Sequence, residues 1–115
     1  MDFAVSARQS GGTTIIDVRG PVMYGEAVAL HEMLHSLMKV GQKNILLNLG
    51  EVTQLDSSGI GVLVRTYLSV KKSGGALKVM HLTKQVQRIL EVTRLSELLE
   101  DYPDEEAALK SFAPR

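Results

Sequence analysis

The sequence has 115 residues with 13 basic and 13 acidic side chains. It fits one domain with a single core and offers no cationic field for nucleic acid or an anionic membrane. It contains no cysteine, which excludes disulfides and thiolate metal sites. No apolar run approaches the roughly twenty residues of a membrane span, and no secretory signal pattern opens the chain, so we expect a cytoplasmic protein without membrane insertion.

The N-terminal part of the chain predicts a β-hairpin and a helix. Residues 3–8 alternate apolar and polar, a glycine turn follows, and the β-branched run 13–19 supplies the second strand, which Gly20-Pro21 closes. From 24 to 39 the apolar period becomes helical, with an inward stripe of Ala27, Leu30, Leu34 and Leu37.

The segment 44–68 predicts a buried strand followed by a helix. Residues 45–49 are a short apolar run typical of a buried strand, and 50–55 are read as a polar connector. Asp56-Ser57-Ser58-Gly59 then opens a helix that runs to Lys72. The residues expected to face inward are Ile60, Leu63, Val64, Tyr67 and Leu68.

The remaining chain predicts one strand over 76–82, a helix from the cap Thr83 to about Val92, a short final strand around 95–99, and a last helix opened by Pro103. Helices between successive strands indicate parallel neighbours. The predicted fold is α/β: a single domain over residues 1–115, with a mixed sheet of four or five strands and helices packed mainly on one face.

The turn at Asp56 allows two interpretations. One is purely structural: Asp and Ser cap a helix, and Gly59 and Gly61 allow close packing on the sheet. The other is functional, because two glycines each weaken a helix by about 1 kcal/mol and leave its serine-bearing end open to a partner. Free amides and the helix dipole at such an end also tolerate an anion such as phosphate.

Two stretches resemble a known family. Ile45-Leu-Leu-Asn-Leu49, followed by Leu55-Asp-Ser-Ser-Gly-Ile-Gly-Val-Leu63, is similar to the signature of bacterial anti-sigma factor antagonists, which are STAS domains. The resemblance extends over nearly the whole chain, including the opening hairpin and the Gly74-Gly75 break before a strand. It implies that Ser57 is a phosphorylation site, with Ser58 as a secondary acceptor.

The resemblance also implies a partner switch without catalysis, cofactor or metal of its own. The unphosphorylated protein would bind an anti-sigma factor that is also a serine kinase, and so free a sigma factor. Phosphorylation would separate the pair, and a serine phosphatase would reset it. The expected docking surface comprises the loop Gly20–Gly25 and the exposed side of the helix 60–72, with the contact residues Met23, Tyr24, Asp56, Ser57, Ser58, Gly59 and Gly61. The exposure of Tyr24 stays open, since it also fits the core edge.

One departure favours an alternative. Many family members carry Gly-Glu-Leu-Asp after the second strand, whereas this chain has Gly20-Pro-Val-Met23 and loses both acidic positions. The alternative is therefore a STAS adaptor without phosphorylation, for example a scaffold subunit or a partner of a transporter ATPase. The sequence does not identify the sigma factor, kinase, signal or oligomeric state.

A different class of function is suggested by His31-Glu32-Met33-Leu34-His35. This matches the H-E-x-x-H pattern of zinc hydrolases, in which two imidazoles one turn apart hold the metal. We expect these polar side chains to face solvent beside the apolar stripe, and the third histidine, His81, lies on another element. A solvated helix face is the preferred interpretation.

Overall fold

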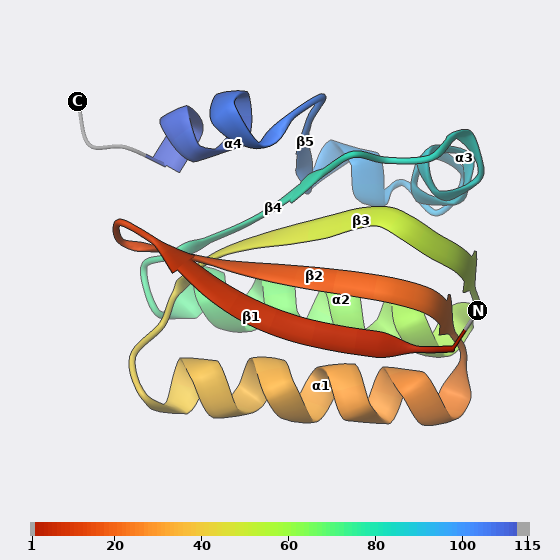
Figure 1. The fold of residues 1–115 in the computed structure, drawn as a ribbon, viewed down its shortest axis with the longest axis horizontal. Helices are drawn as coiled ribbons and strands as arrows, with labels where there is room; N and C mark the ends of the chain where they lie inside the picture. Colours follow the sequence, from red (N-terminus) through yellow and green to blue (C-terminus); the bar gives the residue numbers. More distant parts are fainter. Residues whose placement is uncertain (1, 113–115) are drawn as a thin grey trace.

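The chain folds as ten elements in a computed structural model that describes residues 2–112 (Figure 1). In chain order these are β1 Ala4–Ser10, β2 Thr13–Val22, α1 Tyr24–Lys39, β3 Asn44–Leu55, α2 Ser57–Lys72, β4 Ala76–Met80, α3 Lys84–Val92, the 3-10 turn η1 Leu95–Glu97, β5 Glu100–Tyr102 and α4 Glu105–Phe112. Among these, no helix combines the length and the hydropathy needed to cross a membrane.

The strands form one five-stranded sheet in the order β1-β2-β3-β4-β5. The opening hairpin pairs β1 and β2 antiparallel, and every later neighbour is parallel. A helix joins each parallel pair, as parallel strands require. The mixed α/β sheet predicted from the sequence is confirmed, with β1 as its exposed antiparallel edge.

Alternating residues of the central strands divide the core between the two faces of the sheet. Ile16, Leu47 and Val79 belong to the larger cluster, together with the buried residues of α1, α2 and α3. Ile15 and Leu46 belong to a smaller cluster that α4 covers through Ala108, Leu109 and Phe112. In Figure 1, α1 and α2 run side by side beneath the sheet, and α4 lies across the opposite side. The helices therefore lie mainly on one face, as predicted.

Strand β3 is longer than predicted, and the expected connector 50–55 belongs to it. Its polar residues Glu51, Thr53 and Gln54 are exposed while Val52 is buried. The extension is held by β2, which itself continues to Val22 instead of ending before a loop. The two strands end level because Val22 is the register partner of Leu55, after two register shifts earlier in the pair. The polar residues of 50–55 made this segment look like a loop, although pairing with β2 holds it as a strand.

Two further predictions were wrong in position. The final strand is Glu100–Tyr102, whereas residues 95–97 form η1, which buries Leu95 and leaves Leu98 45% exposed. On α2, Ile60, Leu63, Val64 and Tyr67 pack against the core as predicted, whereas Leu68 is 56% exposed. The buried residues of this helix that were not predicted are Gly59, Val62, Thr66 and Val70. The inward face therefore includes a glycine and a threonine that a search for apolar residues passes over.

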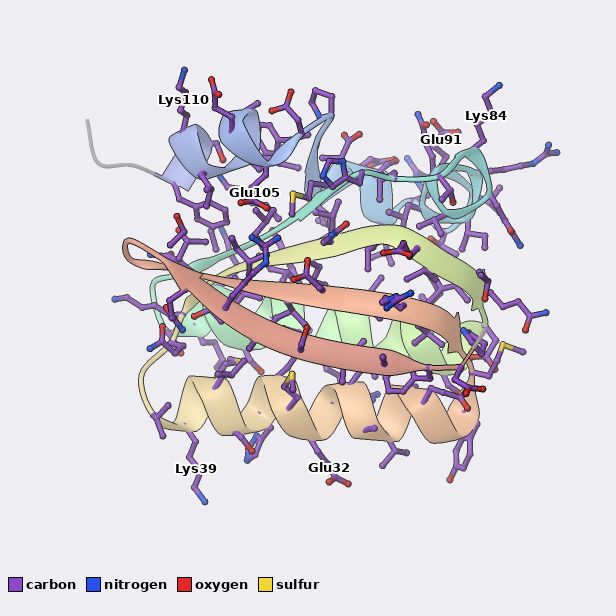
Figure 2. All side chains as sticks on the ribbon, viewed as in Figure 1. Glu32, Lys39, Lys84, Glu91, Glu105 and Lys110 are labelled. Carbon is purple, nitrogen blue, oxygen red and sulfur yellow. The ribbon has the colours of Figure 1, made fainter. Side chains whose placement is uncertain are left out.

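A polar network ties the open side of the sheet to α4. The Arg8 guanidinium donates to both carboxylate oxygens of Asp17, at 2.7 and 3.1 Å, and to Glu105 on α4, at 2.6 and 3.1 Å. The amide of Asn48 also donates to Asp17, at 2.8 Å. The hydrogen bond from Arg8 is the main cause that lowers the pKa of Asp17 below its ordinary value. Figure 2 shows Glu105 pointing from α4 toward the sheet.

Candidate functional site

The site begins where β3 gives way to α2. Asp56 caps the helix: its backbone is extended, and its Oδ1 accepts hydrogen bonds from the amides of Ser58, at 2.9 Å, and Gly59, at 3.3 Å. The amide of Asp56 donates to the carbonyl of Val22, at 3.5 Å. The aspartate thus satisfies two unpaired amides of the helix start and ties it to the end of β2.

The capping arrangement leaves Ser57 at the surface. Ser57 is the first residue of α2 and is exposed, while Ser58 is half-buried. Among residues 2–112, the Ser57 hydroxyl takes part in no hydrogen bond, since Asp56 rather than Ser57 provides the cap. An exposed hydroxyl at an amide-rich helix start is open to modification.

The two glycines of this segment have different surroundings. Gly59 is buried, and a β-carbon there would lie 3.0 Å from the carbonyl oxygen of Val22. The close approach at Gly59 is therefore to the protein's own backbone. At Gly61 a β-carbon would meet only the side chain of Arg65, whose Nη1 would be 3.2 Å away. Gly61 thus makes room for a flexible side chain at the surface.

Apolar side chains from the start of α1 lie exposed beside this turn. Met23 is 37% exposed, Tyr24 75% and Val28 45%. Of the predicted docking segment Gly20–Gly25, Gly20 and Val22 are buried parts of β2, so the exposed portion begins at Met23. The Tyr24 ring is largely outside the core. Large exposed apolar groups gathered in one place mark an interaction surface.

An open cavity of about 270 Å³ lies between α1 and α2 next to the serines. Its lining includes Tyr24, Val28 and His31 from α1, and Ser57, Gly61 and Arg65 from α2. The two helix starts therefore form one surface. It consists of an apolar rim from α1, the exposed hydroxyl of Ser57, and the side chains of His31 and Arg65. We call this combination the Ser57 surface.

Comparisons with known proteins match most of the chain to one family. The family model for the STAS domain matches residues 4–108. The chain belongs to the STAS domain family. It is 30% identical over 100 residues to the anti-sigma-B factor antagonist of Bacillus subtilis, covering 87% of this chain and 91% of that relative. The anti-sigma-B factor antagonist of Staphylococcus aureus is 29% identical over 70 residues, 61% of this chain and 65% of the relative.

Solved structures show the same STAS fold. A crystal structure of an anti-sigma factor antagonist from Mycobacterium paratuberculosis has a TM-score of 0.87 and 22% identity, covering 96% of this chain and 94% of that one. The unphosphorylated form of the anti-sigma factor antagonist SpoIIAA has a TM-score of 0.81 and 16% identity, covering 96% and 100%. The phosphorylated form of SpoIIAA from Bacillus has a TM-score of 0.75 and 16% identity, covering 94% of this chain and 99% of that one. At identities of 16–22%, these structures show a shared fold and nothing beyond it.

Within this STAS domain, the two acidic positions missing after β2 leave a partial helix cap. Met23 occupies the N-cap of α1 and has no carboxylate to offer. Glu26 supplies the other half of the motif, because its Oε1 accepts from the Met23 amide at 3.0 Å. The helix start is thus stabilised from within the helix, and the residue at its tip is free to be apolar.

The H-E-x-x-H residues divide between the Ser57 surface and solvent. The rings of His31 and His35 stack with centroids 6.1 Å apart, and Figure 2 shows Glu32 pointing away from the sheet. Within residues 2–112, no group of three or more His, Cys, Asp or Glu side chains is placed to hold a metal ion. His31 differs from the prediction of a solvent-facing residue, since it is half-buried and its Nδ1 is buried.

The sequence reading therefore missed two members of the Ser57 surface, His31 and Arg65. Arg65 follows Ser57 by two helical turns, and long helical side chains point back toward the N-terminus of their helix. Combined with Gly61 midway between them, that spacing was a usable signal. His31 was hidden because it depends on how α1 lies beside α2.

Proposed function

We propose that this STAS domain is a partner-switching regulator in which Ser57 is the phosphoacceptor. Unphosphorylated, it binds an anti-sigma factor that is also a serine kinase, and this frees a sigma factor. The observation that carries the proposal is the exposed, uncommitted hydroxyl of Ser57 at the capped start of α2, beside the exposed apolar residues Met23 and Tyr24. The family membership supports an anti-sigma factor as the partner.

The chemistry of the switch belongs to the partner. The kinase moves the γ-phosphoryl group of ATP to the Ser57 Oγ, the hydroxyl proton leaves and ADP is released. The domain supplies a positioned acceptor and no catalytic group or cofactor. A serine phosphatase hydrolyses the phosphoester and returns the domain to its binding form. Because it must meet both the kinase and the phosphatase, the protein would act in the cytoplasm.

Phosphorylation opposes binding for a local electrostatic reason. A phosphoserine adds a charge of about −2 and a strongly hydrated group. At residue 57 this charge would enter the middle of the Ser57 surface, next to the carboxylate of Asp56. Rebinding would then require desolvation of the phosphate against a partner surface suited to a neutral hydroxyl.

The test uses purified protein, the anti-sigma factor kinase of the same host and ATP. Intact mass should show one added phosphoryl group on the parent protein and on Ser58→Ala, and none on Ser57→Ala. The Ser58→Ala variant is the matched control, since it alters the neighbouring hydroxyl and keeps the Asp56 cap. Phosphate on residue 58 in the parent protein, or on neither serine, would contradict the assignment.

A second candidate function is a STAS adaptor that is never phosphorylated. The observation that favours it is the replacement of both acidic positions of the family pattern by Pro21, inside β2, and Met23, directly after it. Ser57→Asp separates the two candidates in a binding assay. A phospho-switch predicts at least a tenfold weaker partner complex with folding intact, whereas an adaptor predicts unchanged affinity.

A further inference from the structure

We propose that Arg65 and His31 form an internal receptor that holds the phosphate of Ser57 against the domain's own surface. The inference rests on the proposed phosphorylation of Ser57 and adds what the domain does with the phosphate once it is there. It concerns the cavity between α1 and α2, which all three residues line.

Arg65 is placed to reach a phosphate on Ser57. Its guanidinium folds back along α2 until Nη1 lies 3.2 Å from the position that a β-carbon of Gly61 would occupy. Gly61 is four residues from Ser57, about 6 Å along the helix axis. A phosphoserine side chain extends into that interval, so a change of rotamer brings phosphate oxygen and guanidinium together. A side chain at residue 61 would stand between them.

The guanidinium is also uncommitted. Within residues 2–112, Arg65 makes no ion pair or side-chain hydrogen bond, whereas Arg8, Arg19 and Arg94 each hold a carboxylate. A guanidinium presents planar paired donors that match phosphate geometry. Here it lies at the edge of a cavity with an apolar wall formed by Val28 and Tyr24.

His31 supplies a second, unusual group from the opposite helix. Its Nδ1 is buried and has no hydrogen-bond partner among the described residues. A buried polar atom without a partner costs free energy, and such atoms are uncommon in folded proteins. A phosphate in the cavity that His31 lines supplies acceptor oxygens, and a protonated imidazole has two N–H donors; the ring must turn for the buried Nδ1 to reach them. The His35 ring stacks on that of His31, with centroids 6.1 Å apart.

The charges around the cavity favour a dianion. The titratable groups that line it are Tyr24, His31 and Arg65, and none of the lining residues is acidic. The acid next to Ser57 in the sequence is Asp56. The Asp56 Oδ1 is already engaged by two amides of the helix start. The receptor thus offers the Arg65 guanidinium and the His31 ring to a phosphate that the Asp56 carboxylate repels, and the phosphate is drawn over the cavity.

The consequence is a change in the whole Ser57 surface. A phosphate held by Arg65 and His31 covers the cavity and removes Arg65 from any contact with a partner. The phosphorylated domain is then stabilised in a form whose cavity is closed, in addition to being repelled by the partner. Phosphorylation thus stabilises the free domain and destabilises its complex with the partner, and both effects favour release.

The test installs phosphoserine at position 57 during translation, so it requires no kinase and stands apart from whether Ser57 is phosphorylated in the host. The phosphate is titrated by phosphorus NMR in the full chain, in Arg65→Gln and in Arg88→Gln. A free phosphoserine has a second pKa near 6. A neighbouring cation lowers such a pKa.

We expect the second pKa of the phosphate to be lower by about half a unit or more in the parent protein than in Arg65→Gln. Arg88→Gln is the matched control, an exposed arginine on α3, and should titrate like the parent. His31→Gln should lose part of the shift. Equal pKa values in the parent and Arg65→Gln, with both folded by circular dichroism, would overturn the receptor, and no effect of His31→Gln would remove His31 from it.

Discussion

The backbone of Gly59 packs directly against Val22: a β-carbon on residue 59 would lie 3.0 Å from the carbonyl oxygen of Val22. That oxygen also accepts the amide of Asp56. The start of α2 is therefore pressed against the end of β2, and the serines are presented from a rigid base rather than from a free loop.

This contact predicts opposite outcomes for the two glycines of α2. Gly59→Ala should lower the free energy of unfolding by about 1–3 kcal/mol, because the added methyl group would overlap Cδ1 of Leu55 and press against the carbonyl oxygen of Val22. Gly61→Ala should change it by less than about 1 kcal/mol, and in the stabilising direction, since alanine favours the helix and only the flexible Arg65 must move. Urea unfolding of both variants measures the difference. Equal destabilisation would mean that the packing at Gly59 is looser than described.

A second prediction concerns the Asp56 cap. Asp56→Ala should cost about 1 kcal/mol of stability, because the amides of Ser58 and Gly59 lose their acceptor. It should also weaken partner binding, since the helix start that carries Ser57 frays. Thr83→Ala is the matched control: its hydroxyl caps α3, accepting from the Val86 amide at 3.1 Å, and Thr83 is not among the residues that line the cavity at Ser57. Urea unfolding should show a similar loss of stability for both variants, whereas an affinity measurement should show weakened binding only for Asp56→Ala.

The apolar rim of the Ser57 surface should contribute affinity with little effect on folding. Tyr24 is 75% exposed, so Tyr24→Ala should change the free energy of unfolding by no more than about 0.5 kcal/mol. As a large exposed ring beside Ser57, Tyr24 should contribute strongly to the proposed interface, so its removal should cost about tenfold or more in partner affinity. Val92→Ala removes a side chain that is 76% exposed on α3, and calorimetry should record no change in affinity for it. Binding unaffected by Tyr24→Ala would move the interface elsewhere.

How far the sequence predicted this protein depended on which interactions were local. The helix 24–39 and the Asp56 cap were predicted correctly, because their stripes and capping residues are readable within one turn. The strand over 50–55 was not, since Glu51, Thr53 and Gln54 are polar and the segment is held by pairing with β2. The same reason explains His31, whose surroundings come from a second helix.

Acid should destabilise the fold partly through Asp17. Its pKa is lowered in the folded protein, chiefly by the hydrogen bond from Arg8, so the unfolded chain binds the proton more tightly. The stabilising contribution is present above the unfolded value, near 3.9, and is lost as the pH falls below it. Asp17→Asn should lower stability at neutral pH by about 1 kcal/mol and flatten the dependence between about pH 5 and pH 2. Thermal melts across this range provide the measurement, with the exposed Asp101→Asn as control.

Metal should have no influence on the protein. The Nδ1 of His31 is buried, and the rings of His31 and His35 stack at an interplanar angle of 25° with centroids 6.1 Å apart. Neither zinc addition nor a chelator should shift the melting temperature, and protein dialysed against buffer should retain no zinc by elemental analysis. Stoichiometric zinc that is lost on His31→Gln would revive the hydrolase interpretation.

Strands β2 and β3 end at the same level, where Val22 is paired with Leu55, and this brings the segments that follow them side by side. Under the proposed function, the segment at the end of β2 would select the partner, and the segment after β3 would carry the phosphorylation that times its release. Substitutions at residues 21–24 would therefore change partner specificity while phosphorylation at Ser57 stays unchanged. Adding or deleting a single residue in either strand would slide one piece past the other by about 3.3 Å and uncouple the two.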